Sequence, residues 1–326
     1  MKEKNQEEES INKKNMKEKD IKTNKNETLG ILYSLLTEFI WTLNSVSLKY
    51  ITKNYHSIFK NKSFIFASRL STLIISFILG KLKDGKIYSL SEFTPQIKRC
   101  ILIRANLSFF SMCFWTIAVF YLRITTCQII STLSPILIIT FSVIFLKEKY
   151  HSRYAYGILF GIIGSVTIVL NEKKLKANKK DSNIYEILIG IIAILINISL
   201  SGISSVSNKI MAKNKVSIYT QMFYLGIFHC LYSFLWMLFT WDFNYTLGYF
   251  FLSSTQSILF FVANYFMFCS HKMIDLSKTS LFQYTKVVFV FILGLLILGE
   301  KVFLTDIIGS SIIVGFMSYH LLHPIK

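Results

Sequence analysis

Two side chains of opposite charge interrupt long apolar stretches of the sequence. Glu38 lies about ten residues into the stretch 29–48, and Lys286 lies near the middle of the stretch 276–298. An ionisable side chain at such a depth in a membrane is costly unless it faces a cavity or a partner. We therefore expect Glu38 to be functional, with a purely structural role as the alternative. Three interpretations of Lys286 stay open. It pairs with Glu38, it binds an anionic substrate, or the bounds of its apolar stretch are misplaced so that it does not lie at mid-membrane depth.

Four further side chains are candidates for the same site. Arg69 lies closer to the end of its stretch, where a long side chain can reach the interface, so a structural role is its alternative. Trp41, Tyr265 and Tyr284 lie in stretches that also contain polar residues, and each is expected either to line a pocket or to pack between helices. The candidate substrate-binding residues are Glu38, Trp41, Arg69, Tyr265, Tyr284 and Lys286.

Pro135 is the only proline inside an apolar stretch, and it follows Ser134 in the middle of residues 126–146. Proline has no backbone N–H, so it frees a carbonyl of the preceding turn and bends a helix. Membrane helices tolerate such a bend where a cavity needs shaping. The sequence therefore predicts a helix kink at Pro135.

Motifs for chemistry on a bound substrate are missing from the sequence. It contains no Ser/His/Asp set at one membrane face, no HExxH, no phosphate-binding glycine loop and no Rossmann glycine pattern. Its cysteines stand singly in or beside apolar stretches, without the spacing of metal ligands. We expect a protein that is not an enzyme and that uses no cofactor and no metal.

The elements that must position these residues are apolar. Of the 326 residues, 52% are hydrophobic and the mean hydropathy is +0.48, which excludes an ordinary soluble globule. Each stretch is too long for a barrel strand and lacks alternation, so its backbone can be satisfied in lipid only as a helix. The fold class expected is an all-α polytopic membrane protein with ten transmembrane helices. They are placed at 29–48, 64–82, 105–122, 126–146, 154–170, 184–203, 218–239, 247–268, 276–298 and 304–322.

Residues 1–27 differ from the rest in composition. They contain eight lysines, seven acidic residues and only four apolar side chains, which predicts a disordered cytosolic tail. The formal net charge of +18 is typical of proteins that bind nucleic acid. We discount that partner because the lysine excess accompanies many Ile, Asn, Phe and Tyr residues, as translation of an AT-rich genome produces. The partners expected are the lipid bilayer and a small-molecule substrate.

An internal repeat is the most informative pattern. The segment SVSLKYITKN at 45–54 matches SVSNKIMAKN at 205–214 in six of ten positions, at an offset of 160. At an offset of 152, Leu146, Glu148 and Lys149 fall on Leu298, Glu300 and Lys301. These matches predict one half at 28–171 and another at 184–326, joined by a basic linker at 172–183. Five spans per half place the two copies in opposite orientations.

The distribution of charge favours cytosolic termini. Lys and Arg are more numerous in the segments that lie inside when the N-terminus is cytosolic. No address signal distinguishes the plasma membrane from an internal membrane. Gly157, Gly161 and Gly164 form a stripe of small residues that favours close helix packing, and a homodimer interface is one interpretation of it.

Taken together, these motifs resemble EamA-type carriers of the drug/metabolite transporter superfamily, over roughly residues 28–323. The resemblance rests on a first span that ends in Lys49, on Arg69 and Arg104, and on two ordered segments. The first segment is 126–157, with Ser134-Pro135 and the sequence LKEK at 146–149, and the second is 284–309, with LGEK at 298–301.

The resemblance implies a bundle of two inverted five-helix halves around a central cavity that opens alternately to either side. It implies a transporter of a small polar organic metabolite, whose charge stays open. A non-transporting membrane scaffold, receptor or scramblase is the alternative, because a fold by itself does not set a function. The sequence departs from the family pattern at Val287, which aligns with Pro135, and at Lys286, where a small or uncharged residue is expected.

Overall fold

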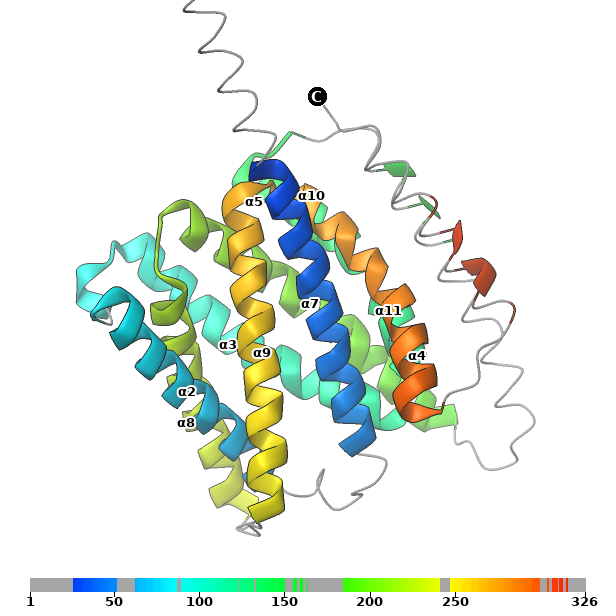
Figure 1. Ribbon diagram of the computed structural model, residues 1–326, viewed down its shortest axis with the longest axis horizontal. Helices are drawn as coiled ribbons and strands as arrows, with labels where there is room; N and C mark the ends of the chain where they lie inside the picture. Colours follow the sequence, from blue (N-terminus) through cyan, green and yellow to red (C-terminus); the bar gives the residue numbers. More distant parts are fainter. Residues whose placement is uncertain are drawn as a thin grey trace, which may run out of the picture.

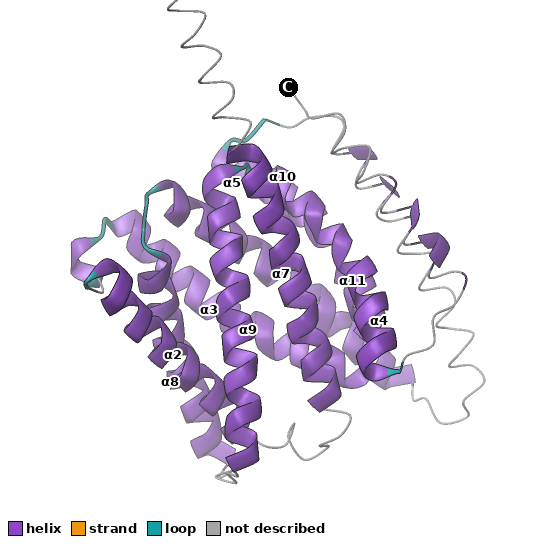
Figure 2. Ribbon diagram, viewed as in Figure 1, coloured by secondary structure: helices purple, strands orange, loops and turns teal. Residues whose placement is uncertain are grey.

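The computed structural model describes residues 26–51, 62–86, 89–122, 124–131, 133–149, 184–240 and 247–299, and scattered helical residues within 155–163 and 304–315. Every long element in this described part is a helix, as Figure 2 shows. Seven helices are long and apolar enough to cross a membrane, which identifies an integral multi-pass membrane protein. Residues 1–25 of the predicted tail, the linker at 172–183 and the glycines of the small-residue stripe lie outside the described residues, as do most of the predicted spans 154–170 and 304–322. The last two residues of the predicted tail, 26 and 27, instead begin the first helix.

The helices follow the predicted stretches closely, except where polar residues extend them. α3 begins at Pro95, well before the predicted start near 105, because Thr94 accepts a hydrogen bond from the Ile97 N–H and Pro95 suits a first turn. α7 continues to Lys213, beyond the predicted end near 203. The long helices are the first helix (Asn26–Ile51), α2 (Lys62–Asp84), α3 (Pro95–Tyr121), α7 (Ile184–Lys213), α8 (Ile218–Thr240) and α9 (Leu247–Met273).

The fourth and ninth predicted spans are each interrupted. The fourth consists of α4 (Ile124–Ser131) and α5 (Ser134–Leu146), with Pro135 in the first turn of α5. The ninth consists of α10 (Leu276–Leu281), the short turn η2 (Phe282–Tyr284), α11 (Thr285–Leu293) and η3 (Gly294–Leu298). At the offset of 152 both spans begin and end at equivalent residues, and η2 overlaps the positions equivalent to the end of α4, although only the first span contains a proline.

The two halves also share the left-handed residue that ends this span. Lys147 after α5 has a φ of 54°, and Gly299 after η3 has a φ of 62°. These positions are equivalent at the offset of 152. Glycine adopts this conformation without a steric penalty, whereas lysine at the first position does not.

A lysine at the end of the first helix of each half binds the end of the third helix. Lys49 Nζ donates to the carbonyls of Val119, at 2.6 Å, and Leu122, at 3.0 Å, at the end of α3. Its repeat equivalent, Lys209, donates to the equivalent carbonyls of His271, at 2.7 Å, and Ile274. The last carbonyls of a helix have no partner within it and attract positive charge. The repeated lysine is therefore a cap for a neighbouring helix.

Two equivalent glycines allow the halves to cross closely. A Cβ atom at Gly30 would lie 2.8 Å from Ile274 Cγ2, and one at Gly190 would lie 2.6 Å from Leu122 Cγ. The first helix therefore begins beside the end of α9, as Figure 1 shows in blue and yellow, and α7 begins beside the end of α3. Because Lys49 at the end of the first helix also contacts Leu122, the first helix and α7 run in opposite directions.

We expect Lys209→Met to lower stability by about 1–3 kcal/mol, because it leaves two buried carbonyls without a donor. Thermal unfolding of the purified protein in detergent measures this change. The matched control is Lys213→Met, which removes an exposed lysine from the last turn of the same helix and should have little effect. Equal stability of Lys209→Met and the wild type would contradict the capping role.

A candidate substrate cavity between the two halves

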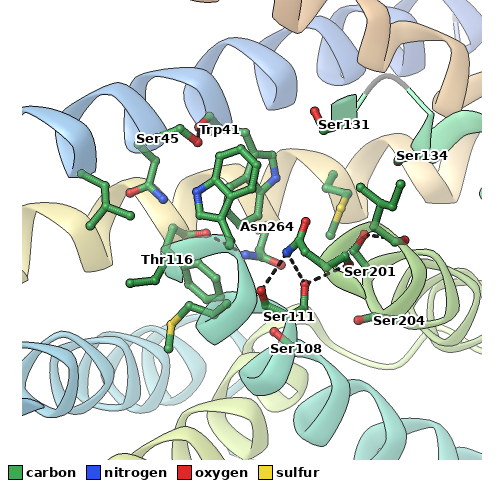
Figure 3. Close-up of a pocket in the computed structure, with 18 of the residues that line it drawn as sticks. Trp41, Ser45, Ser108, Ser111, Thr116, Ser131, Ser134, Ser201, Ser204 and Asn264 are labelled. Atoms are coloured by element: carbon green, nitrogen blue, oxygen red, sulfur yellow. Dashed lines mark hydrogen bonds between the residues drawn. The ribbon is translucent and has the colours of Figure 1, made fainter. Parts of the chain in front are cut away.

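A cavity of about 260 Å³, lined by both polar and apolar side chains, lies between the halves. Figure 3 shows side chains from the first helix, α3, α7 and α9 that point into the same space. The uncharged polar residues that line it are Asn44, Ser45, Ser68, Ser108, Ser111, Thr116, Gln128, Ser131, Ser134, Asn197, Ser201, Ser204, Ser205, Gln256, Asn264 and Gln283. Such a lining suits a ligand that forms many hydrogen bonds.

Serine can occupy these spans because it bonds to its own helix. The hydroxyl of Ser45 donates to the Trp41 carbonyl at 2.9 Å, and the equivalent Ser205 donates to the Ser201 carbonyl at 2.9 Å. A hydroxyl that has given its proton to the helix still presents acceptor lone pairs. The Asn197 amide is held by Ser111, whose carbonyl and hydroxyl it contacts at 2.7 and 2.8 Å.

Glu38 and Lys286 meet at the cavity. The Lys286 Nζ lies 3.0 Å from Glu38 Oε2, and the side chains are 20% and 5% exposed. This oxygen has no hydrogen bond in the described part of the chain, so the contact is an ion pair without good hydrogen-bond geometry. Because Glu38 is on the first helix and Lys286 on α11, the pair joins the two halves.

Arg69 lines the cavity from α2 and is 8% exposed. Its guanidinium carbon lies 4.5 Å from the centre of the Phe260 ring, and Phe260 in turn packs edge-on against Trp41 at 5.5 Å. The Nε and Nη1 atoms have no hydrogen-bond partner among the described residues. The ring thus holds the cation through its face and leaves N–H donors available.

Arg104 also lines the cavity, but its donors are occupied. It donates to the amide oxygen of Gln221 on α8 and, at 3.0 Å, to that of Asn264 on α9. It therefore ties α3 to the second half. Neither amide is close to Arg104 in the sequence, so this network was not predictable from the local pattern.

Two of the predicted site residues do not line this cavity. Tyr265 faces a second cleft of about 540 Å³, where its ring lies 6.5 Å from that of Tyr219. Tyr265 follows the cavity residue Asn264, and one residue turns a helix by about 100°, which points it elsewhere. Tyr284 is 1% exposed and packs in an apolar cluster with Ile139 and Ile274.

Glu148 has a role that the sequence analysis did not assign. Its carboxylate accepts hydrogen bonds from the backbone N–H groups of Leu276, at 3.2 Å, and Ser277, at 3.1 Å, and from the Ser277 hydroxyl at 2.8 Å. Asp275 precedes α10 without capping it, so the acid of the first half supplies the acceptor. The repeated LKEK and LGEK sequences were the signal that this position matters.

The chain is similar to known proteins in sequence pattern and in fold. A family model described as the EamA-like transporter family matches residues 28–170 and 188–318. None of the curated proteins compared with the chain matches it. A protein of known crystal structure superposes with a TM-score of 0.66 and 16% identity, over 92% of this chain and 97% of its own. A likeness at this identity shows a shared fold.

The two buried arginines should differ in their contribution to stability. We expect Arg104→Met to lower stability by about 2–3 kcal/mol, because it leaves two buried amide oxygens without a charged donor. Arg69→Met should leave stability unchanged or raise it, since it removes a buried cation that lacks a carboxylate partner. Chemical unfolding of both variants measures the difference. A similar loss of stability in both variants would contradict the conclusion that only Arg104 has a structural role.

Proposed function

Because the chain belongs to the EamA-like transporter family, we propose that it carries a small polar organic metabolite across a membrane by alternating access around the central cavity. The observation that carries the proposal is the cavity itself, to which both halves contribute hydrogen-bonding side chains. Members of this family are generally transporters, and a hydrogen-bonding cavity inside membrane-spanning helices gives such a substrate a place to bind. No step of this function requires covalent chemistry.

We also propose that the complete bundle has ten helices in two inverted halves. The equivalent lysine caps, glycine crossings and broken spans support this arrangement. An inverted repeat gives a carrier two conformations of similar structure, because each half can adopt the shape of the other. The proposed orientation has both termini in the cytosol, as the distribution of Lys and Arg indicates.

Two kinds of polar contact matter for the proposed movement of the halves: contacts within one half and contacts between the two halves. Both lysine caps join helices of the same half, so they favour rigid-body movement. Three polar contacts join different halves on the side where the first helix begins, which we call the N-terminal side. They are Glu148 with Ser277, Asp84 with Ser217, and Glu27 with Lys278.

The cavity extends away from that side. On the first helix its lining runs from Glu38 to Leu48, in the second part of the helix, and on α2 it runs from Phe64 to Arg69, near the start. Both positions lie towards the opposite side of the bundle. The structure thus supports a conformation closed on the N-terminal side, and the return step would separate the three contacts that close it.

Transport and its dependence on the cavity can be tested before the substrate is identified. Proteoliposomes are incubated with a cellular metabolite extract, and the compounds taken up are identified by mass spectrometry. We expect Ser204→Trp, which fills the cavity, to abolish uptake, and Ser199→Trp, on the exposed face of the same helix, to retain it. Lipid scrambling without uptake of any metabolite would contradict the proposal and favour a scramblase.

The Glu38–Lys286 pair allows a second test. Lys286→Met leaves the buried Glu38 carboxylate unpaired and should lower stability by about 3–5 kcal/mol. Glu38→Gln should lower stability by less, because the Lys286 that it leaves unpaired is 20% exposed and faces the cavity. The double variant removes both charges and should recover most of that stability. If the pair takes part in the transport cycle, the folded double variant loses uptake. Wild-type uptake by the double variant would assign the pair to structure alone.

A further inference from the structure

We infer that the substrate is an anion, with a carboxylate or phosphate group, and that Arg69 rather than Lys286 binds that group. The inference rests on the proposed function and specifies the substrate class of the same cavity. It follows from a comparison of the charged side chains that line the cavity, which differ in the partners they already have.

The charges that line the cavity do not balance. Its charged residues are Glu38, Arg69, Arg104 and Lys286. Glu38 and Lys286 neutralise each other through their ion pair. Arg104 donates to two uncharged amides, which satisfy its hydrogen bonds without cancelling its charge. The lining therefore keeps two positive charges, which attract anions and disfavour amines.

Among these cations, Arg69 has neither a carboxylate nor an amide partner in the described part of the chain. Lys286 forms an ion pair with Glu38, and Arg104 donates to the amide oxygens of Gln221 and Asn264. Arg69 is more than nine-tenths buried, and its Nε and Nη1 atoms have no hydrogen-bond partner among the described residues. A buried polar atom without a partner costs free energy, and an anionic ligand that accepts its hydrogen bonds would remove that cost.

The surroundings of Arg69 orient it for such a ligand. Phe260 covers the face of the guanidinium at 4.5 Å, so a ligand must approach an edge. The edges of a guanidinium match the paired oxygens of carboxylates and phosphates. Ser68, the neighbour of Arg69 on α2, and Asn264 also line the cavity and can bind hydroxyl groups of the same molecule. This combination fits a hydroxylated acid or a phosphorylated polyol.

The Glu38–Lys286 pair has a supporting part in this arrangement. A lone carboxylate in the lining would repel an anion, and Lys286 cancels that repulsion from 3.0 Å. The lysine then acts on the substrate through Glu38, as a positioning residue, and Arg69 makes the contact.

The test uses matched compounds that differ only in charge. Purified full-length protein is titrated at constant ionic strength with gluconate and glucose, and with glycerol 3-phosphate and glycerol, and thermal stabilisation is recorded. We expect an anionic member to bind the wild type at least about tenfold more tightly than its neutral partner, as charge-assisted hydrogen bonds allow. Arg69→Met should lose this preference, and Arg99→Met, at an exposed position of α3, should keep it.

Three results would overturn the inference. One is that no anion stabilises the wild type, and another is that the neutral partners bind equally well. The third is that Arg69→Met, once shown to be folded by its unfolding transition, binds anions like the wild type. Failure of the proposed function looks different, because anions would then bind the wild type through Arg69 while proteoliposomes take up no metabolite.

Discussion

The need to satisfy polar groups away from water governs how this bundle is held together. In hydrocarbon each unpaired backbone group costs several kcal/mol, so a helix that ends inside the protein needs donors from elsewhere. Lys49 and Lys209 supply them at the ends of α3 and α9. The same lysines fix the first and third helices of each half against each other. In the proposed transport cycle, these contacts favour movement of each half as a unit.

The contacts between the halves are both apolar and polar. Ile97 and Ile101 at the start of α3 pack in one apolar cluster with Met211 and Val216 of the second half. Glu148 binds the start of α10 on the same side of the bundle. Polar contacts can exchange their partners for water at low cost. In the proposed alternating access, opening of the N-terminal side would have to separate the apolar cluster as well.

The polar groups that line the cavity differ in whether they have hydrogen-bond partners within the protein. Serine hydroxyls and amides there are largely satisfied by nearby backbone or by one another, as Asn197 is by Ser111. Arg69 keeps N–H groups without acceptors among the described residues although it is buried, and the amide oxygen of Asn44 in the same lining is also unpaired there. Functional sites commonly retain such unfavourable features, since a group already bonded within the protein is less available to a ligand. Arg104 has the same side chain but donates to two amide oxygens. We therefore propose a structural role for Arg104 and a binding role for Arg69.

The fold class and the positions of most helices follow from the amino-acid sequence alone, because long apolar stretches can satisfy their backbones in lipid only as helices. The repeat follows from matched residues such as those at 45–54 and 205–214. It also brought Glu38 and Lys286 to attention, because charge at that depth is rarely incidental. Which residues share the cavity depends on how the helices pack. Neighbours such as Asn264 and Tyr265 have similar local sequence, yet helix geometry turns one into the cavity and the other into a separate cleft. The partners of Arg69, Arg104 and Glu148 come from distant helices, so their roles depend on packing that no local pattern encodes.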